Sequence, residues 1–142
     1  MSTPKKTWRE KLAESKDLPK TMVIPSPAEV DEVMRRVPKG RLMTINEIRT
    51  CLARKHSTDI ACPMTTGIFA WIAAHAAEES RTAGEKNVTP YWRTLKTGGE
   101  LNPKYPGGVT ALKKLLAAEG HKVIRKGKKH IVRDYERRLA SL

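Results

Sequence analysis

The chain has 142 residues, of which 39% are apolar and 30% are charged, so it can form one folded domain and is too apolar to remain disordered. The net charge of +13 indicates a polyanionic partner, with nucleic acid ahead of an anionic membrane surface. No apolar run is long enough to span a bilayer, and the N-terminal region lacks the apolar core of a signal peptide. Two cysteines cannot form a disulfide framework, and the histidines lack metal-ligand spacing. We therefore expect a protein without cofactor or metal, not bound to a membrane, and cytoplasmic (nucleoid-associated, or nuclear in a eukaryote).

Residues 1–25 are expected to form a basic N-terminal arm, and residues 26–142 the folded domain. Residues 1–24 contain six basic and three acidic side chains, and a short amphipathic helix around Trp8 and Leu12 is one interpretation. A solvated tail is the other. Pro19, Pro25 and Pro27 mark a linker between the arm and the domain.

Two capping boxes predict the first two helices of the domain. Ser26 and Glu29 open one helix, and Thr44 and Glu47 open the next. Apolar residues then recur at helical spacing in each segment, and they are Val30, Val33, Met34 and Val37, followed by Ile45, Ile48 and Leu52.

A third helix is predicted from Pro63 to about Glu79. Its polar first turn after a tight loop favours a helix-turn-helix arrangement. We expect Trp71 and Phe69 to lie in the core. The apolar face that this spacing predicts consists of Ile68, Trp71, Ile72, His75 and Ala76.

The remaining segments complete a mainly α fold with a small β-hairpin, resembling a winged helix. Residues 84–108 show no helical period but are too apolar for disorder, which predicts a packed, working loop. A fourth helix is expected over 107–119, with Gly120 after its end. Alternating residues around Lys126-Gly127 predict a basic hairpin, and residues 134–142 a short final helix.

Three stretches point to a known family. They are Val37–Thr44 (VPKGRLMT), Pro90–Arg93 (PYWR), and Tyr105–Gly108 (YPGG) followed by Leu115–Gly120 (LLAAEG). In this order they resemble the C-terminal DNA-binding domain of the 6-O-methylguanine-DNA methyltransferases, and most of all the non-catalytic alkyltransferase-like proteins. The resemblance covers residues 28–121 and implies a protein that recognises 6-O-alkylguanine-type bases in double-stranded DNA and passes them to other repair proteins.

The resemblance also implies that the chain is not an enzyme. Family members have Pro-Cys-His-Arg at the reaction centre, whereas this chain has Tyr91 for the acceptor cysteine and Trp92 for the histidine. A phenol is a poor nucleophile beside a thiolate. The family's base-rotating tyrosine and its gap-filling arginine correspond to Ile45 and Met64, which puts base flipping in question.

By the same resemblance, two groups of residues form the expected site. The lesion pocket comprises Tyr91, Trp92, Arg93, Tyr105 and Glu119. The DNA-contacting residues comprise Thr44, Met64, Thr65, Thr66, Gly67, Lys126, Lys128 and Lys129.

Several alternatives stay open at this point. Tyr91 and Trp92 could be core aromatics that anchor a long loop, and Glu119 could be an ordinary helix-end residue. The chain could be a general winged-helix DNA-binding or regulatory protein without lesion preference. Cys62 is either a displaced nucleophile or an inert buried thiol, and charge alone does not separate DNA from RNA.

Overall fold

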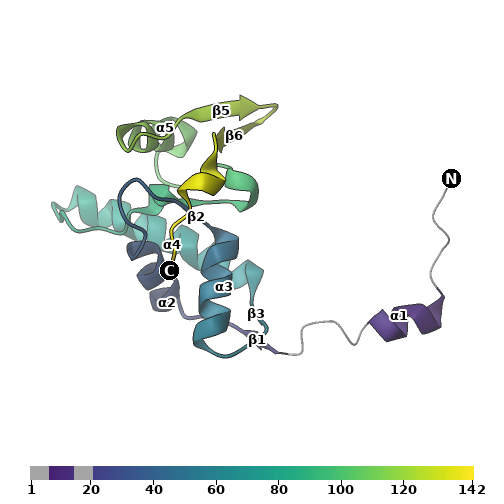
Figure 1. Ribbon diagram of the computed structural model, residues 1–142. Coiled ribbons are helices and arrows are strands. Elements are labelled where there is room, and N and C mark those ends of the chain that lie inside the picture. Colours follow the sequence, from purple (N-terminus) through teal and green to yellow (C-terminus); the bar gives the residue numbers. More distant parts are fainter. Residues whose placement is uncertain (1–6, 15–20) are drawn as a thin grey trace.

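The computed structural model describes residues 7–14 and 21–142. Helix α1 (Trp8–Glu14) is followed, after the undescribed residues, by strand β1 (Met22–Val23), which pairs in parallel with β3 (Ile60–Ala61). Figure 1 shows α1 apart from the body and β1 against it. The last residues of the predicted arm therefore belong to the folded body. Two-residue strands leave no alternating pattern in a sequence, so this pairing could not be expected.

The predicted capping boxes are confirmed for α2 (Pro27–Arg35) and α3 (Ile45–Lys55). The backbone N–H of Glu29 donates to the Ser26 hydroxyl at 3.2 Å, and the Ser26 N–H donates to the Glu29 carboxylate at 3.1 Å. Thr44 and Glu47 form the same reciprocal pair at the start of α3. Both helices therefore begin where the sequence predicts.

Helix α4 (Pro63–Thr82) is the longest helix among the described residues, and its buried face differs from the predicted one. The buried side chains are small, namely Thr66, Ala70, Ala73, Ala74 and Ala77. Small side chains let α2 pack closely against α4. The prediction that Trp71 lies in the core is wrong: Ile68, Trp71 and Ile72 are each more than two-fifths exposed. Phe69 is partly buried against the core.

The segment between α4 and α5 (Gly108–Ala118) is packed against the body, as predicted, but it is more regular than its sequence suggests. It contains 3-10 turns at Tyr91–Arg93 and Thr97–Gly99, and strand β4 (Thr94–Leu95) pairs in parallel with β2 (Met43–Thr44). Leu95 and Leu101 are almost completely buried. The strand pairing and the buried leucines thus hold the segment against the body of the molecule.

The C-terminal part follows the prediction closely. Helix α5 (Gly108–Ala118) precedes an antiparallel hairpin of β5 (Val123–Lys126) and β6 (Lys129–Val132). The predicted final helix is a single 3-10 turn, Tyr135–Arg138, after which the Ala140 N–H donates to the Leu42 carbonyl at 2.8 Å. The chain end is therefore bonded to the segment before β2 (Figure 1).

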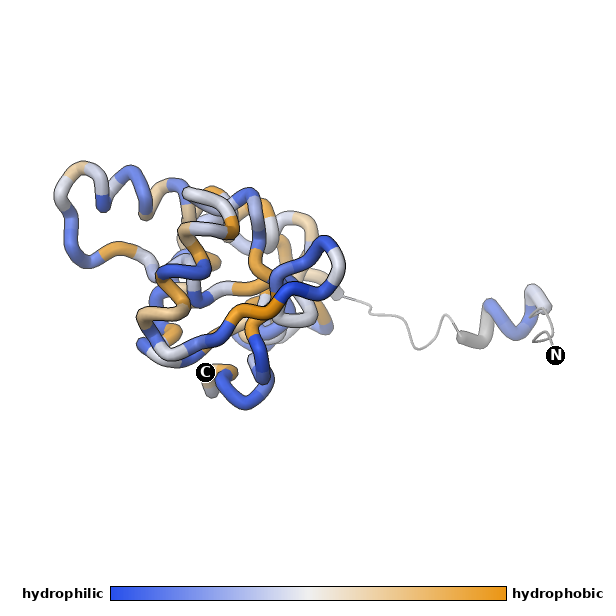
Figure 2. The backbone as a smooth tube through the Cα atoms, turned by 90° about the horizontal axis from the view of Figure 1, so that it is seen from above, coloured by the Kyte–Doolittle hydropathy of each residue, from blue (hydrophilic) through white to orange (hydrophobic). Residues whose placement is uncertain are grey.

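The core lies where α2, α3, α4 and α5 meet the packed segment. Its largest fully buried side chains include Met34, Leu42, Ile48, Leu52, Leu95, Leu101 and Leu116. Apolar stretches run through the body while many outer turns are hydrophilic (Figure 2). The mainly helical fold class with small sheets and a hairpin is confirmed.

Candidate nucleic-acid interface

A groove of about 660 Å³ opens between the start of α4, the start of α3 and the loop before α5. Two helix starts border it, so first-turn N–H groups, which have no acceptor within their own helix, lie near it. The lining residues are Ile45, Asn46, Arg49, Pro63, Met64, Gly67, Ile68, Trp71, Lys96, Thr97, Asn102, Pro103, Lys104 and Tyr105.

The α4 side of the groove is apolar and exposed. Met64 is 72% exposed, Ile68 45% and Trp71 43%, and the three residues follow one another at i, i+4 and i+7 on one face of the helix. Large apolar side chains gathered in a hollow mark an interaction surface far more often than isolated exposed ones do. This face therefore has the character of a binding surface.

The polar side of the groove is basic. Arg49, Lys96 and Lys104 line it, and none of the lining residues is acidic. The Arg49 Nε donates to the Ala61 carbonyl at 2.9 Å, which fixes the guanidinium beside the α4 start. Lys96 lies 3.5 Å from the Glu100 carboxylate. The groove thus combines an apolar floor with a positively charged edge, a combination that suits nucleic acid.

The loop that closes the groove is held by α4 itself. The Trp71 Nε1 donates to the Lys104 carbonyl at 3.1 Å, and the His75 Nε2 lies 2.9 Å from the same oxygen. The two rings meet edge to face, with centroids 5.3 Å apart. Trp71 is therefore oriented by its hydrogen bond while more than two-fifths of the residue stays exposed.

The predicted residues at the α4 start divide into two groups. Met64 and Gly67 line the groove, and a Cβ added at Gly67 would meet nothing within 4 Å. Thr66 is fully buried and its hydroxyl donates to the Cys62 carbonyl at 2.7 Å, so this hydroxyl is not on the surface. Thr65 is half-buried, with its hydroxyl 3.5 Å from the same carbonyl. Thr44, also predicted to contact DNA, is buried and forms the α3 capping box with Glu47.

Cys62 stands at the N-cap of α4 and is half-buried. Hydrogen bonds from the Thr65 hydroxyl and from the Thr65 and Met64 backbone, together with the nearby Arg49 charge, hold the pKa of its thiol below the ordinary value despite some desolvation. Cys62 is not among the residues that line the groove.

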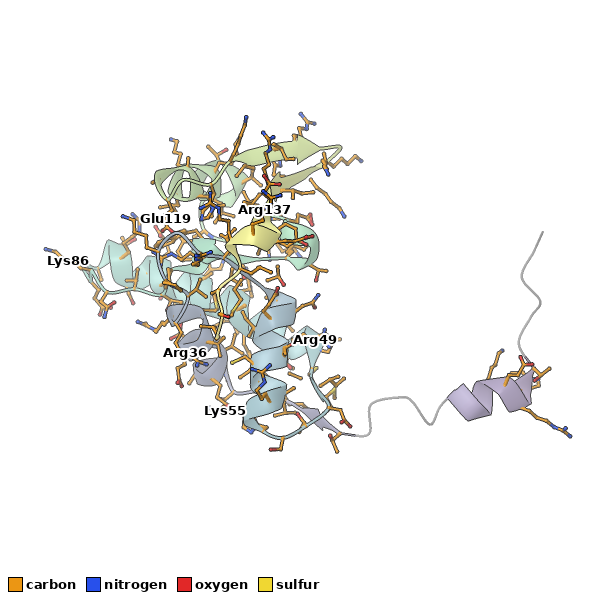
Figure 3. The ribbon with its side chains drawn as sticks, viewed as in Figure 1. Arg36, Arg49, Lys55, Lys86, Glu119 and Arg137 are labelled. Atoms are coloured by element: carbon orange, nitrogen blue, oxygen red, sulfur yellow. The ribbon has the colours of Figure 1, made fainter. Side chains whose placement is uncertain are left out.

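Three residues of the predicted lesion pocket, Trp92, Arg93 and Glu119, form a partly buried cluster. Arg93 donates from Nε at 2.9 Å and from Nη2 at 2.9 Å to the Glu119 carboxylate, and the Trp92 Nε1 donates to it at 2.6 Å. The Gly40 N–H adds a fourth donor at 3.0 Å. The Arg93 Nη1 donates to the Val37 carbonyl at 2.8 Å. We call Glu119, Arg93, Trp92, Gly40 and Val37 the Glu119 cluster. Figure 3 marks the position of Glu119.

The Glu119 cluster keeps its carboxylate charged. Burial by itself raises the pKa of Glu119, but the hydrogen bonds from Arg93, Gly40 and Trp92 outweigh it and hold the pKa below its usual value. The Glu119 side chain is 6% exposed and that of Arg93 14%. The cluster joins the turn before β2, the 3-10 turn after Pro90 and the end of α5, so it stabilises the fold by linking three segments that are distant in the chain.

The two predicted pocket tyrosines lie against each other behind the groove. Tyr91 is 2% exposed and its hydroxyl donates to the Glu78 carboxylate at 3.2 Å, while burial and then the Glu78 charge raise its pKa to about 12. Tyr105 is 3% exposed but lines the groove, and burial raises its pKa as well. Both phenols are therefore protonated at neutral pH. The rings meet edge to face at 6.3 Å.

The hairpin lysines are exposed and joined to the groove wall. Lys126, Lys128 and Lys129 lie at and around the turn of β5 and β6. The neighbouring strand is bonded to the wall, because Glu100 bridges to Ile131 and the Leu101 N–H donates to the His130 carbonyl at 2.8 Å. The structure therefore places these charges on a hairpin fixed to one wall of the groove.

The sequence did not identify Ile68, Trp71, Arg49, Lys96 or Lys104 as site residues. A usable signal was present, because Met64, Ile68 and Trp71 share a helix face that is separate from the alanines at 70, 73, 74 and 77. Helical period alone does not decide which of two apolar faces is buried. The cations carry no pattern of their own.

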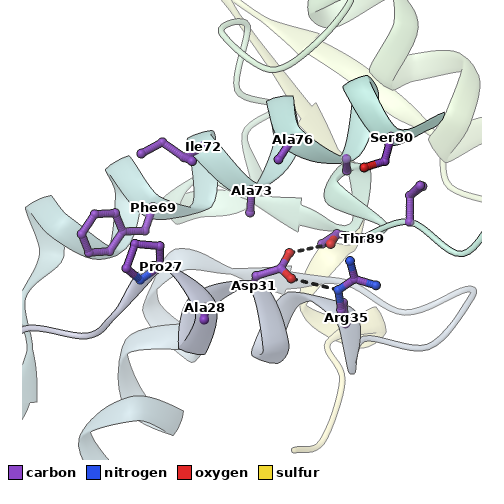
Figure 4. A pocket seen from close by; sticks show the side chains of 12 residues that line it. Pro27, Ala28, Asp31, Arg35, Phe69, Ile72, Ala73, Ala76, Ser80 and Thr89 are labelled. Carbon is purple, nitrogen blue, oxygen red and sulfur yellow. Dashed lines mark hydrogen bonds and ion pairs between the residues drawn. The ribbon is translucent and has the colours of Figure 1, made fainter. Parts of the chain in front are cut away.

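A second hollow, of about 240 Å³, lies between α2 and α4 on a neighbouring face (Figure 4). Phe69, Ile72 and alanines line it, and Asp31 bonds there to Arg35 at 2.9 Å and to Thr89 at 2.5 Å. Ile72, labelled in Figure 4, is one of the α4 residues that border this hollow. Neighbouring residues of α4 thus serve two different surfaces.

Two further findings hold for residues 7–14 and 21–142. No helix there is both long enough and apolar enough to cross a membrane. No group of three or more histidine, cysteine, aspartate or glutamate side chains is arranged there to hold a metal ion.

The chain was compared with known proteins and structures. No protein-family model matches it, and no curated protein sequence does. Its fold is similar to a crystal structure of S. pombe Atl1 in complex with damaged DNA containing O6-carboxymethylguanine, with a TM-score of 0.58 and 16% identity over 82% of this chain and 94% of that one. A structure of S. pombe ATL in complex with DNA matches with the same values. At this identity the match shows the fold.

Proposed function

We propose that the groove binds double-stranded DNA and holds an alkylated base of the 6-O-alkylguanine type. The observation that carries the proposal is the acid-free groove at the start of α4, with exposed apolar side chains beside Arg49, Lys96 and Lys104. The similar fold of Atl1, whose structure holds damaged DNA, supports this use of the surface.

In the proposed complex, the first half of α4 enters the minor groove of the duplex. Gly67 lets the DNA approach the helix closely, since no side chain stands there. Met64, the most exposed residue of this face, fills the gap that a displaced base leaves in the stack. Arg49, Lys104 and the hairpin lysines contact phosphates, which adds affinity without sequence preference.

The base is proposed to lie against Trp71, Ile68 and Tyr105. Trp71 offers a large exposed ring whose orientation is fixed by the Lys104 carbonyl. Tyr91, buried beside Tyr105, shapes the wall behind it, and the partly buried Trp92 packs against Tyr91. Extrusion costs least at a damaged pair, so a binding pocket alone can select lesions.

The proposal includes recognition without alkyl transfer. The phenol at Tyr91, where the family has its acceptor cysteine, has a pKa of about 12 and donates a hydrogen bond to the Glu78 carboxylate. It is therefore uncharged and a weak nucleophile at neutral pH. A lesion held without reaction would be passed to other repair proteins.

The test is a fluorescence-anisotropy titration of two duplexes that differ only by one 6-O-methylguanine, at two salt concentrations. Tighter binding of the damaged duplex at both salts is the expected result. Equal, salt-sensitive binding would instead make the chain a general DNA-binding protein, and preference for an RNA duplex of the same sequence would reject DNA.

A second measurement tests alkyl transfer. The mass of the protein should be unchanged after incubation with the damaged duplex. A gain of one methyl group that disappears in Cys62→Ser would reject the non-enzymatic assignment.

The hairpin contribution is tested by replacing Lys128 and Lys129 together with alanine. Each lost phosphate contact lowers the steepness of log affinity against log salt by about 0.9, so the slope should flatten by roughly one to two units on damaged and intact DNA alike. Lys113→Ala with Lys114→Ala, an equal charge loss on exposed positions of α5, is the control. An unchanged slope in the hairpin variant would show that the hairpin does not contact phosphate.

A further inference from the structure

Helix α1 takes no part in the interface described so far. Its sequence contains one tryptophan, two basic residues and two acidic residues. Its start is capped reciprocally, because the Glu10 N–H donates to the Thr7 hydroxyl and the Thr7 N–H donates to the Glu10 carboxylate, both at 3.2 Å. Trp8 is 83% exposed, and the Lys11 ammonium lies 4.5 Å from the centre of its ring. The helix thus presents one open aromatic ring with one cation over it, and the exposed Arg9 adds a second positive charge next to Trp8 in the sequence.

The chain returns from α1 to the body at a fixed point. The Thr21 N–H and hydroxyl donate to the Asp59 carboxylate at 3.0 and 3.1 Å, and the Asp59 N–H donates to the Thr21 hydroxyl at 2.9 Å. Strand β1 follows at once and pairs with β3, the strand directly before α4. The root of the arm is therefore attached beside the helix that we propose to enter the DNA.

A basic track connects this root with the groove. A hollow of about 510 Å³ between α3 and β3 has Asn46 and Arg49 in common with the groove, so the two adjoin at these residues. Arg54 lines this hollow, and Asp59, its acidic lining residue, is bonded to Thr21. Arg49, labelled in Figure 3, stands on α3 at the junction. A phosphate backbone leaving the groove would meet Arg49 and then Arg54 before reaching the arm.

We infer that α1 is a second DNA contact, which extends the interface beyond the groove through the hollow between α3 and β3. The inference rests on the proposed function. Arg9 and Lys11 neutralise phosphates that lie outside the groove, and Trp8 packs against the sugar or base next to them. DNA is the occupant because the track starts at the groove that we propose to bind DNA, and because its two arginines outnumber its one carboxylate, Asp59, which is turned to Thr21.

The test uses a double variant of the full chain, Arg9→Ala together with Lys11→Ala, which we call the arm variant. Its control is the double variant Lys113→Ala, Lys114→Ala. Each is titrated, over a range of salt, with a duplex that covers only groove and hairpin and with one longer by about one helical turn, roughly ten base pairs. On the longer duplex the arm variant should flatten the salt slope by about two units, and on the shorter one it should match the unaltered chain. The control should behave alike on both duplexes.

Trp8→Ala should weaken binding of the longer duplex several-fold, and Trp8→Phe should restore most of it. Because Trp8 is exposed, all arm variants should unfold at the temperature of the unaltered chain. If the unaltered chain binds both duplexes and the arm variant keeps the slope of the unaltered chain on each of them, the arm inference is wrong while the proposed function stands, and a protein partner becomes the occupant to test for α1. If the unaltered chain binds neither duplex, the proposed function itself fails.

Discussion

The Glu119 cluster and the groove differ in exposure and in kind of contact. In the cluster, charged and aromatic side chains are withdrawn from solvent and bonded to each other, with Glu119 6% and Arg93 14% exposed. In the groove, Met64 and Trp71 stay open to solvent beside the basic side chains of Arg49 and Lys104. Each of the three stretches that carry the family resemblance contributes to the cluster: Val37 and Gly40 come from the first, Trp92 and Arg93 from the second, and Glu119 from the third. A motif can thus mark the frame of a site while other residues form its surface.

This difference separates two kinds of effect. Removing a member of the cluster leaves a charge in a place where water cannot reach it easily, which costs stability. Removing an exposed side chain of the groove leaves no buried charge without its partner, so it should affect binding more than stability. Each variant below either separates the two regions or shows that they act together.

The largest effect is expected from Glu119→Ala. The Arg93 guanidinium would lose its ion pair, and Trp92 and Gly40 would lose their acceptor. Breaking a buried pair by removing one partner costs about 3–5 kcal/mol, so the free energy of unfolding in urea should fall by that order. Glu32→Ala, at an exposed position of α2, is the control and should change it by less than about 0.5 kcal/mol. A loss as small as the control's would show that the cluster does not fasten the fold.

The Glu119 carboxylate makes the free energy of unfolding depend on pH, and the direction follows from its lowered pKa. The pKa of Glu119 is lower in the folded chain than its ordinary value, so the folded state binds its proton less readily than the unfolded state does. Its contribution is complete above the ordinary pKa of a glutamate and is lost as the pH falls through the folded value. Unfolding free energy should therefore decline with acidification from about pH 4.5 downward. Glu119→Gln should flatten that decline; an unchanged pH profile would contradict the assignment.

Trp71→Ala should have the largest effect on binding. The loss of a stacking ring costs about 1–3 kcal/mol per base, or roughly 5- to 150-fold in affinity for the damaged duplex. Ile72→Ala is a matched control, since Ile72 is 44% exposed and Trp71 43%, but Ile72 lines the hollow between α2 and α4. Trp71→Phe should keep most of the affinity. Equal losses for Trp71→Ala and Ile72→Ala would place the DNA across both faces and remove the distinction between them.

Local signals in the sequence predicted much of the fold. Ser26 with Glu29, and Thr44 with Glu47, mark helix starts because the cap is made within four residues. Gly120, with a φ of +87°, follows α5 as expected. These features depend on neighbours along the chain, which a sequence displays directly.

The features that the sequence left open depend on distant neighbours. The β2–β4 pairing joins Met43 to Thr94, and the Gly40 bond to Glu119 crosses 79 positions. Which apolar face of α4 is buried depends on α2, whose approach requires the alanines. The resemblance named Tyr91, Trp92 and Glu119, but it carried no information about their exposure. The groove could be found only once the loop before α5 had been placed against α4.

Tyr91→Phe should have the smallest effect and tests the boundary between the two regions. It removes one hydroxyl that donates to Glu78 at 3.2 Å and keeps the ring against Tyr105. Such a bond contributes about 1 kcal/mol, so the unfolding free energy should fall by that amount. Affinity for damaged and intact duplexes should not change, because Tyr91 is 2% exposed and does not line the groove. A selective loss of the damaged duplex, at unchanged stability, would mean that the base reaches past Tyr105 to this hydroxyl and that the tyrosine belongs to the surface after all.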